Sequence, residues 1–265
     1  MTILSSSSLF HYTKSLDSLI SILSSGFRYS TVREPYPQIG WGNSPFTALG
    51  LQRTFVDNNV VCFCDIPLTQ AIEHRRYYNS YAIGLSKEWA KLNHVTPVRY
   101  VHSNSPGFSG IIMELMEIHY NQKNLQSNFV QEYVRHKCNR SIDIDRLSDE
   151  ARFVIKALED FLTEALDFIA SGSPFFKAYE IDDPIQKTPT KNYYDEREWR
   201  AYSVNPDNNN LTFSWPDIDF ILCATKYDCD VLYKQRKHFV DFLQIKPVSR
   251  IWQKLLSFEE IDANF

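Results

Sequence analysis

The sequence has none of the long apolar runs, export signals or nucleotide-binding motifs by which many chains can be classified at once. Because it contains no run of about 18 apolar residues, no segment is expected to span a membrane. The opening stretch, MTILSSSSLFHY, has neither a basic n-region nor an apolar h-region, which predicts that it is not a secretory signal. The G-x-G-x-x-G, P-loop and G-x-S-x-G patterns are absent, so the usual signatures of nucleotide-binding and hydrolase sites are missing.

An excess of positive charge is missing as well. The chain carries 28 Lys and Arg against 32 Asp and Glu, a net charge of −4, so no overall field favours nucleic acid or an anionic membrane surface. The short basic runs RHKCNR and YKQRKH are interpreted as solvated helix faces, with nucleic-acid binding through them as the weaker alternative.

Cysteine is sparse and irregularly spaced. The chain has five cysteines, an odd number, and no predicted export signal, which indicates reduced thiols and a cytoplasmic location. Cys62 and Cys64 lie in the apolar run VVCFC, and the seven histidines are scattered without the spacing of metal ligands. Buried structural thiols are therefore favoured, and no metal site is predicted.

The composition is that of an ordinary globular protein. At 265 residues and 43% hydrophobic content, the chain can bury a core as one domain, residues 1–265, with a substantial insertion. Leu16, Leu19 and Leu23 recur at helical spacing before Gly26, which predicts an amphipathic helix that stops at the glycine.

Strands and helices are predicted in blocks without regular alternation, which indicates the α+β class. Apolar or alternating patterns predict strands at 9–13, 59–68, 82–86, 97–103, 175–181, 193–202, 218–225 and 246–253. Helical patterns are expected at 15–26, 149–172 and 229–245, with a short helix or turn at 70–81, a long loop at 30–58 and a helical insertion at about 110–172.

The first group of candidate site residues is His11, Tyr12 and Thr13, where the first strand leads into the first helix. A histidine in this position can offer one ring nitrogen to a ligand hydroxyl while the fold holds the other. The alternative is local packing, with Thr13 or Ser15 capping the helix.

The second group follows the apolar strand at 59–68. Asp65 ends that strand, and His74, Tyr77, Tyr78 and Tyr81 come soon after it. Such side chains can stack on a planar ring and contact phosphates. A hydrogen-bonded structural network around a chain turn explains them equally well.

The third group lies in YYDEREWRAY, residues 193–202. A strand period of two places Glu196, Glu198 and Arg200 on one face. The two carboxylates, about 7 Å apart by strand rise, repel each other, and Arg200 would offset this repulsion. A carboxylate held in a cleft suits the stabilisation of an oxocarbenium-like sugar cation. The alternative is a solvated edge strand with cross-strand ion pairs.

In this order, the motifs resemble the AbiGi family of abortive-infection phage-resistance proteins. The similar stretches are LFHYT with L..IL..GF, then VCFCDIPL…H…Y…IGLSKEW, then EREWR, and they span residues 9 to about 204. Where family members tend to have glycine, this chain has Asn79 and Ala82. Because AbiGi-like proteins have been labelled antitoxins, the resemblance also implies a silent protein that binds a partner toxin or a phage protein.

More distantly, the early histidine and the late glutamate-bearing strand are similar to the ADP-ribosyltransferase fold, including DarT-like toxins. That resemblance implies a split β-sheet core and NAD as the substrate. It gives His11 as the ribose anchor, Tyr77, Tyr78 or Tyr81 as the aromatic that stacks on nicotinamide, Glu198 as the catalytic glutamate and Glu196 as the residue that orients the acceptor.

Two hypotheses of function follow from these resemblances. The leading one is a phage-defence effector that transfers ADP-ribose from NAD to a nucleic-acid base, a protein side chain or water. The alternative is a catalytically silent antitoxin or sensor subunit of a two-gene defence system. Convergence of His11, one of the tyrosines and Glu198 on one site would favour the first hypothesis.

Overall fold

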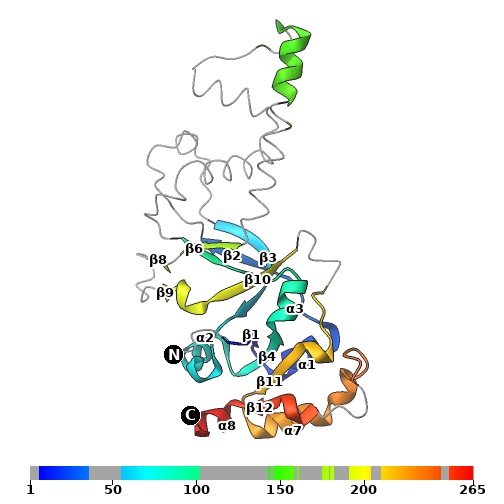
Figure 1. The fold of residues 1–265 in the computed structure, drawn as a ribbon. Helices are drawn as coiled ribbons and strands as arrows, with labels where there is room; N and C mark the ends of the chain where they lie inside the picture. The colour runs from blue at the N-terminus through cyan, green and yellow to red at the C-terminus, as the bar shows by residue number, and fades with distance from the viewer. Residues whose placement is uncertain are drawn as a thin grey trace. The chain divides into compact units, whose positions relative to one another are not determined.

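The computed structural model describes residues 6–35, 55–101, 143, 146–157, 160, 175–178, 180–181, 191–203, 210–245 and 251–264. The chain falls into two compact units (Figure 1). The first comprises Met1–Arg33, Asp57–Arg99 and Glu180–Phe265, and the second comprises Glu34–Val56 and Tyr100–Tyr179.

The second unit contains the segment predicted to be a helical insertion. Residues 149–157 and residue 160 are helical, which confirms the start of the helix predicted at 149–172, and the rest of that prediction lies outside the described residues. A two-stranded sheet pairs β6 (Arg99–Val101) with β7 (Phe176–Ala178). The single domain with an insertion at about 110–172 stays a prediction.

The first unit is built on an eight-stranded sheet in the order β12-β11-β4-β1-β3-β10-β5, with β2 also pairing with β3. β11 and β12 run parallel, whereas the β1–β3, β1–β4, β3–β10, β5–β10 and β4–β11 pairs are antiparallel. A separate hairpin pairs β8 (Glu180–Ile181) with β9 (Lys191–Asn192). The sheet strands are β1 (Ser8–Thr13), β2 (Ser30–Pro35), β3 (Phe55–Cys64), β4 (Tyr81–Ser86), β5 (Thr96–Pro97), β10 (Glu198–Tyr202), β11 (Ile218–Cys223) and β12 (Leu255–Ser257).

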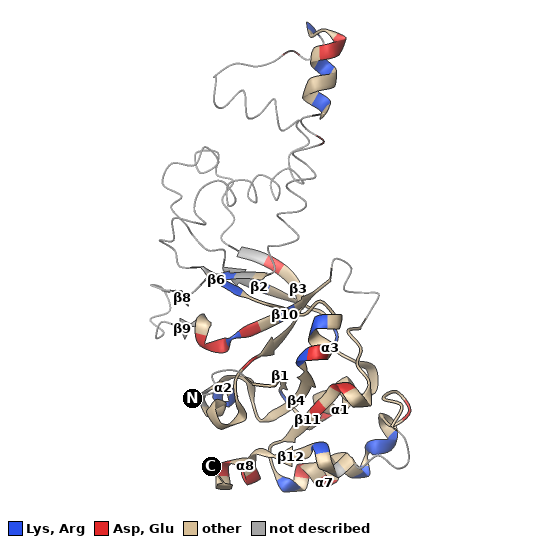
Figure 2. Ribbon diagram, viewed as in Figure 1, with Lys and Arg blue, Asp and Glu red and all other residues tan. Residues whose placement is uncertain are grey.

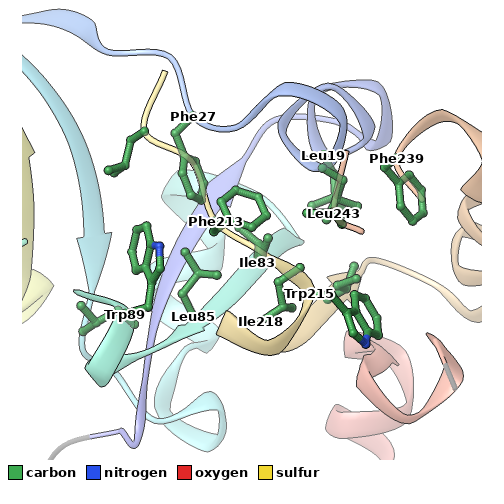
Figure 3. Packing of buried hydrophobic residues seen from close by; sticks show 14 of the residues in the cluster. Leu19, Phe27, Ile83, Leu85, Trp89, Phe213, Trp215, Ile218, Phe239 and Leu243 are labelled. Atoms are coloured by element: carbon green, nitrogen blue, oxygen red, sulfur yellow. The ribbon is translucent and has the colours of Figure 1, made fainter. Parts of the chain in front are cut away.

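Helices cover both faces of this sheet. The larger core contains side chains of α1 (Leu16–Ser25), α3 (Lys87–Leu92) and α7 (Lys226–Lys234), packed against Ile83, Leu85 and Ile218 (Figure 3). The smaller core, around Phe10 and Cys64, takes Phe258 from α8 (Phe258–Asn264) and lies beside α2 (Ile72–Tyr78). Alternation along β1 therefore divides its side chains between two cores, with Leu9 in the larger and Phe10 in the smaller.

The first helix begins and ends as its sequence predicts. The hydroxyl of Ser15 accepts a hydrogen bond from the backbone N–H of Ser18, which caps the helix start. At the other end, Gly26 adopts φ of 81°, a conformation that side chains with a Cβ rarely take. Leu19 and Leu23 then point into the larger core, so the apolar face is the buried one.

The fold class and several of the predicted strands are confirmed. The protein is of the α+β class, as predicted. The strands predicted at 9–13, 59–68, 82–86 and 218–225 correspond to β1, β3, β4 and β11, and the segment 70–81 contains α2. Asn79, which stands where the family tends to have glycine, adopts φ of 70° at the end of α2, so this position keeps a left-handed conformation.

Other predictions need correction. The loop expected at 30–58 contains β2 and the first residues of β3, and the rest of it lies outside the described residues. The helix predicted at 229–245 ends at Lys234, and a 3-10 turn at Arg236–His238 follows it. The strand expected at 246–253 is wrong at residues 251–253, because Ile251–Lys254 is a 3-10 turn and the strand β12 comes after it, and residues 246–250 lie outside the described part of the chain. The short helices α3 and α8 were not predicted, since six or seven residues give too little periodicity.

Among the described residues, the structure contains no helix that is both long enough and apolar enough to cross a membrane.

Gly84 offers a test of the packing between the sheet and the smaller core. A Cβ at this position would lie 2.7 Å from Cε1 of Phe10 and 3.3 Å from Cβ of Phe220. Because the Phe10 ring and Cβ of Phe220 leave little room, Gly84→Ala is expected to lower the free energy of unfolding by about 1–3 kcal/mol, measured by urea denaturation. Adding Phe10→Leu should restore part of the loss, and an unchanged stability of Gly84→Ala would contradict this packing.

Candidate functional site

The candidate glutamates lie where β10 begins. Residues Tyr193–Glu196 form a 3-10 turn, Arg197 takes φ of 43°, and the strand proper starts at Glu198. Figure 2 shows acidic residues in red at the start of β10. In the pairing with β3, Glu198 lies opposite Cys64 and Arg200 opposite Cys62, so both side chains share the face of the smaller core. The predicted common face is confirmed for Glu198 and Arg200, whereas Glu196 lies outside the strand.

Glu198 is held by Arg200. Nε of Arg200 donates to Oε1 of Glu198 at 2.8 Å, and Nη2 donates to Oε2 at 3.2 Å. Arg200 has 0% of its surface exposed and Glu198 has 6%, so the pair is shielded from water. β10 lies between β3 and β5. The alternative of a solvated edge strand is therefore wrong: the ion pair is internal, and it joins two residues of one strand.

Glu196 is also buried, in the 3-10 turn just before β10. It has 7% of its surface exposed, and the hydroxyl of Tyr78 in α2 donates to its Oε1 at 2.5 Å. Burial raises the pKa of the Cys64 thiol, and the neighbouring charges of Asp65, Glu196 and Glu198 raise it further. Cys64, a member of the smaller core opposite Glu198, is thus a protonated and unreactive thiol.

A series of ring contacts runs from Tyr78 through His74 and Tyr12 to Phe258. The ring of His74 lies 4.5 Å from that of Tyr78 and 4.9 Å from that of Tyr12, and Tyr12 stacks on Phe258 at 6.2 Å. Burial raises the pKa of Tyr12, and its hydroxyl has no hydrogen-bond partner among the described residues. The structure therefore brings Tyr12, His74 and Tyr78 together on the face that carries Glu198.

His11 lies on the opposite face. Its ring contacts Phe27 at 4.9 Å and Phe63 at 5.8 Å, both members of the larger core. β1 pairs with β3 at Phe10 and Cys64. At the next residue of β1, Nδ1 of His11 donates a hydrogen bond to the backbone carbonyl of Cys62 at 2.8 Å. Burial lowers the pKa of His11, so the ring is neutral at pH 7.

Asp65 takes part in a structural network. Its Oδ1 accepts from the backbone N–H of Ser6 and its Oδ2 from Nζ of Lys87, both at 2.8 Å. Lys87 also lies over the ring of Trp199, 5.7 Å from its centroid. Sequence reasoning did not single out Lys87, although its place directly after β4 in the stretch IGLSKEW was a usable signal.

Tyr77, Tyr81 and Thr13 are the remaining predicted site residues. Tyr77 is 72% exposed on α2. The hydroxyl of Tyr81 donates to Asp228 at 3.2 Å, and Thr13, the last residue of β1, pairs with Tyr81. No cluster of three or more His, Cys, Asp or Glu side chains that could hold a metal ion occurs in the described part of the chain.

Together, the fold and the site define an α+β protein whose central sheet contains a buried carboxylate–guanidinium pair. A family model described as "Putative abortive phage resistance protein AbiGi, antitoxin" matches residues 53–211, which are 159 of the 265 residues. The chain belongs to this AbiGi family of abortive phage resistance proteins. The matched range contains Glu196, Glu198 and Arg200, whereas His11 precedes it.

A curated relative agrees with this assignment. The chain is 25% identical over 213 residues to "Abortive phage resistance protein AbiGi" of Lactococcus lactis subsp. cremoris, covering 73% of this chain and 80% of the relative. The resemblance to AbiGi in the sequence motifs is thereby confirmed. No solved structure matches the chain.

The lowered pKa of His11 makes stability depend on pH in a definite direction. Because the unfolded chain binds this proton more readily, His11 stabilises the fold fully above pH 6.5, and the contribution is lost as pH falls through the lowered folded pKa. His11→Asn keeps a donor for the carbonyl of Cys62 without a titrating ring. We expect its free energy of unfolding to fall less between pH 6.5 and 5 than that of the unaltered chain. If the two chains lose the same free energy of unfolding between pH 6.5 and 5, measured by urea denaturation, His11 is not the titrating group.

Proposed function

We propose that this protein is the antitoxin of a two-gene abortive-infection system and that it acts in the cytoplasm by binding a partner toxin. The observation that carries the proposal is the pairing of both Glu198 oxygens with Arg200 inside the sheet. A glutamate that stabilises a sugar cation needs its negative charge directed at the substrate. Here that charge is neutralised by the protein's own guanidinium, which favours a binding role over catalysis.

The position of His11 supports the same proposal. A ribose anchor should face the site that contains the catalytic glutamate, yet His11 packs on Phe27 and Phe63 on the other side of the sheet. Its Nδ1 is engaged by the carbonyl of Cys62. The description of the family as an antitoxin agrees with a protein that neutralises a toxin by contact.

The surface near the glutamates offers side chains suited to a protein partner. Tyr77 is 72% exposed and Tyr194 is 52% exposed, and the hydrogen bond from Tyr78 to Glu196 ties their two segments together. Tyrosine is enriched among the residues that contribute most to protein interfaces, because it buries a large rigid ring and keeps a polar hydroxyl.

A second candidate function rests on a different observation. Tyr78, Glu196 and Glu198 gather on one face of the sheet, and the resemblance to ADP-ribosyltransferases gives them the roles of stacking aromatic, acceptor-orienting residue and catalytic residue. In that function NAD is the substrate, and Glu198 has to leave Arg200 to face the nicotinamide–ribose bond. A nucleic-acid base, a protein side chain or water would accept the ADP-ribose.

Paired substitutions separate the two functions. Glu198→Leu with Arg200→Met removes both buried charges and any catalytic carboxylate, and such a joint replacement costs far less stability than leaving one charge alone. Co-expressed with its partner toxin, this variant is expected to restore host growth as well as the unaltered chain does. Arg33→Met with Asp57→Leu, which removes the exposed pair of β2 and β3, is the matched control.

The NAD level of the host cell tests the second candidate function. Expression of the unaltered chain alone should leave growth and the NAD level unchanged. A fall in NAD that Glu198→Gln abolishes would overturn the antitoxin proposal and establish the transferase, provided that circular dichroism shows both chains to be folded.

A further inference from the structure

Three short segments of the first unit are joined by side-chain contacts beside the smaller core. The hydroxyl of Tyr78 in α2 donates to Glu196 of the 3-10 turn at 2.5 Å. Arg75, also in α2, pairs with Asp262 of α8 at 2.6 Å and lies 4.2 Å over the ring of Phe258. We refer to these three segments, Ile72–Tyr78, Tyr193–Glu196 and Phe258–Asn264, as the tyrosine face.

Exposed hydrophobic side chains are concentrated on the tyrosine face. Among the described residues, nine large hydrophobic side chains are exposed, and four of them belong to this face: Ile72, Tyr77, Tyr78 and Tyr194. The other five are spread over the rest of the described chain. Clustered exposed rings are typical of a surface that another protein covers, since contact removes large apolar areas from water while the hydroxyls stay free to bond.

The tyrosine face also carries the whole net charge of the chain. Its 18 residues include six acidic and two basic ones, a formal charge of −4. Of the 32 acidic and 28 basic residues of the chain, 26 of each sign therefore lie elsewhere. The carboxylates of Asp195, Glu259, Glu260 and Asp262 are exposed. In Figure 2, both the turn before β10 and α8 show the red of acidic residues.

Several side chains of the face are fixed within the protein itself. The ring of Tyr78 lies 4.5 Å from that of His74, and its hydroxyl is bonded to Glu196. In α8, the hydroxyl of Ser257 donates to Glu260 at 2.8 Å, and this hydrogen bond lowers the pKa of Glu260 and favours its ionised form. Rings and charges that are already ordered reduce the entropy lost when a partner binds.

We propose that the tyrosine face is the toxin-binding surface and that it docks on a part of the toxin where Lys and Arg surround an apolar groove. This inference rests on the proposed function and names the surface and the chemistry of the partner. Tyr77, Tyr194 and Ile72 supply the apolar centre, and Asp195 and Glu259 pair with the surrounding cations. Apolar rings at the centre with charges at the rim are the usual anatomy of a protein interface.

The negative charge of the face selects among partners. A basic protein surface is attracted to it and associates faster, whereas an acidic surface is repelled. The phosphates of a nucleic acid are repelled for the same reason.

Substitution of the exposed tyrosines tests the surface. The probe is the purified toxin whose growth arrest the unaltered chain relieves, and its dissociation constant is measured by isothermal titration calorimetry. Tyr77→Ala with Tyr194→Ala is expected to weaken binding at least about tenfold, because truncated interface tyrosines are among the costliest losses. Tyr227→Ala on α7 is the matched control: Tyr227 is 74% exposed against 72% for Tyr77, and this variant should bind as the unaltered chain does.

Substitution of the carboxylates tests the charge of the partner. Asp195→Asn with Glu259→Gln should weaken binding about fivefold at low salt and make it less dependent on salt, since rim charges act on the association rate. Asp241→Asn with Glu88→Gln removes two exposed acids from other parts of the chain and should leave both quantities unchanged. Thermal unfolding of each variant shows whether its fold is intact.

Two results would overturn the proposal. One is toxin binding that the double tyrosine substitution leaves unchanged, and the other is an affinity that rises when Asp195 and Glu259 lose their charges. In both cases the unaltered chain still binds and neutralises the toxin, so the proposed function stands while the surface is wrong. If the unaltered chain neutralises no toxin, the proposed function fails, and the assignment of this surface fails with it.

Discussion

The buried ion pair between Glu198 and Arg200 is the interaction on which the rest of the site depends. Removing two charges from water costs several kcal/mol for each ion, and the cost is recovered only when geometry and hydrogen bonds are good. Here both carboxylate oxygens accept from the guanidinium, and the strand that carries the pair is fixed on both sides. The backbone N–H of Val98 donates to the carbonyl of Glu198 at 2.8 Å. The place of β10 between β3 and β5 therefore keeps the pair inside the sheet.

The contacts of Glu196 extend this arrangement to the helices of the smaller core. Tyr78 donates to Glu196, its ring lies against His74, and α2 is joined to α8 by the ion pair of Arg75 with Asp262 at 2.6 Å. Arg75 also lies 4.2 Å over the ring of Phe258. One continuous set of polar and aromatic contacts thus runs from β10 to the last helix. Such a network holds a surface in one shape, which favours a protein that binds a partner.

The sequence predicts well those features that are decided locally. The helix from Leu16 to Ser25 has its apolar spacing, its serine cap and its glycine stop within a dozen residues, and the alternation of Glu198 and Arg200 follows from the strand period. Contacts between residues that are distant in the chain cannot be predicted in this way. Nothing local shows that His11 packs on Phe27 and Phe63, because the choice of face is made by the strand order of the sheet. The 3-10 turn before Glu198 was likewise missed, since it depends on the left-handed conformation of Arg197.

A double-mutant cycle on Glu198 and Arg200 tests the central claim, that the glutamate is a structural partner of the arginine, most directly. The free energies of unfolding of Glu198→Leu, Arg200→Met and the double variant are compared with that of the unaltered chain. We expect each single substitution to cost about 3–5 kcal/mol, because it takes from one buried charge the ion-pair partner shown here, and the double substitution to cost less than either. Additive losses, or a Glu198→Leu variant as stable as the unaltered chain, would contradict the account.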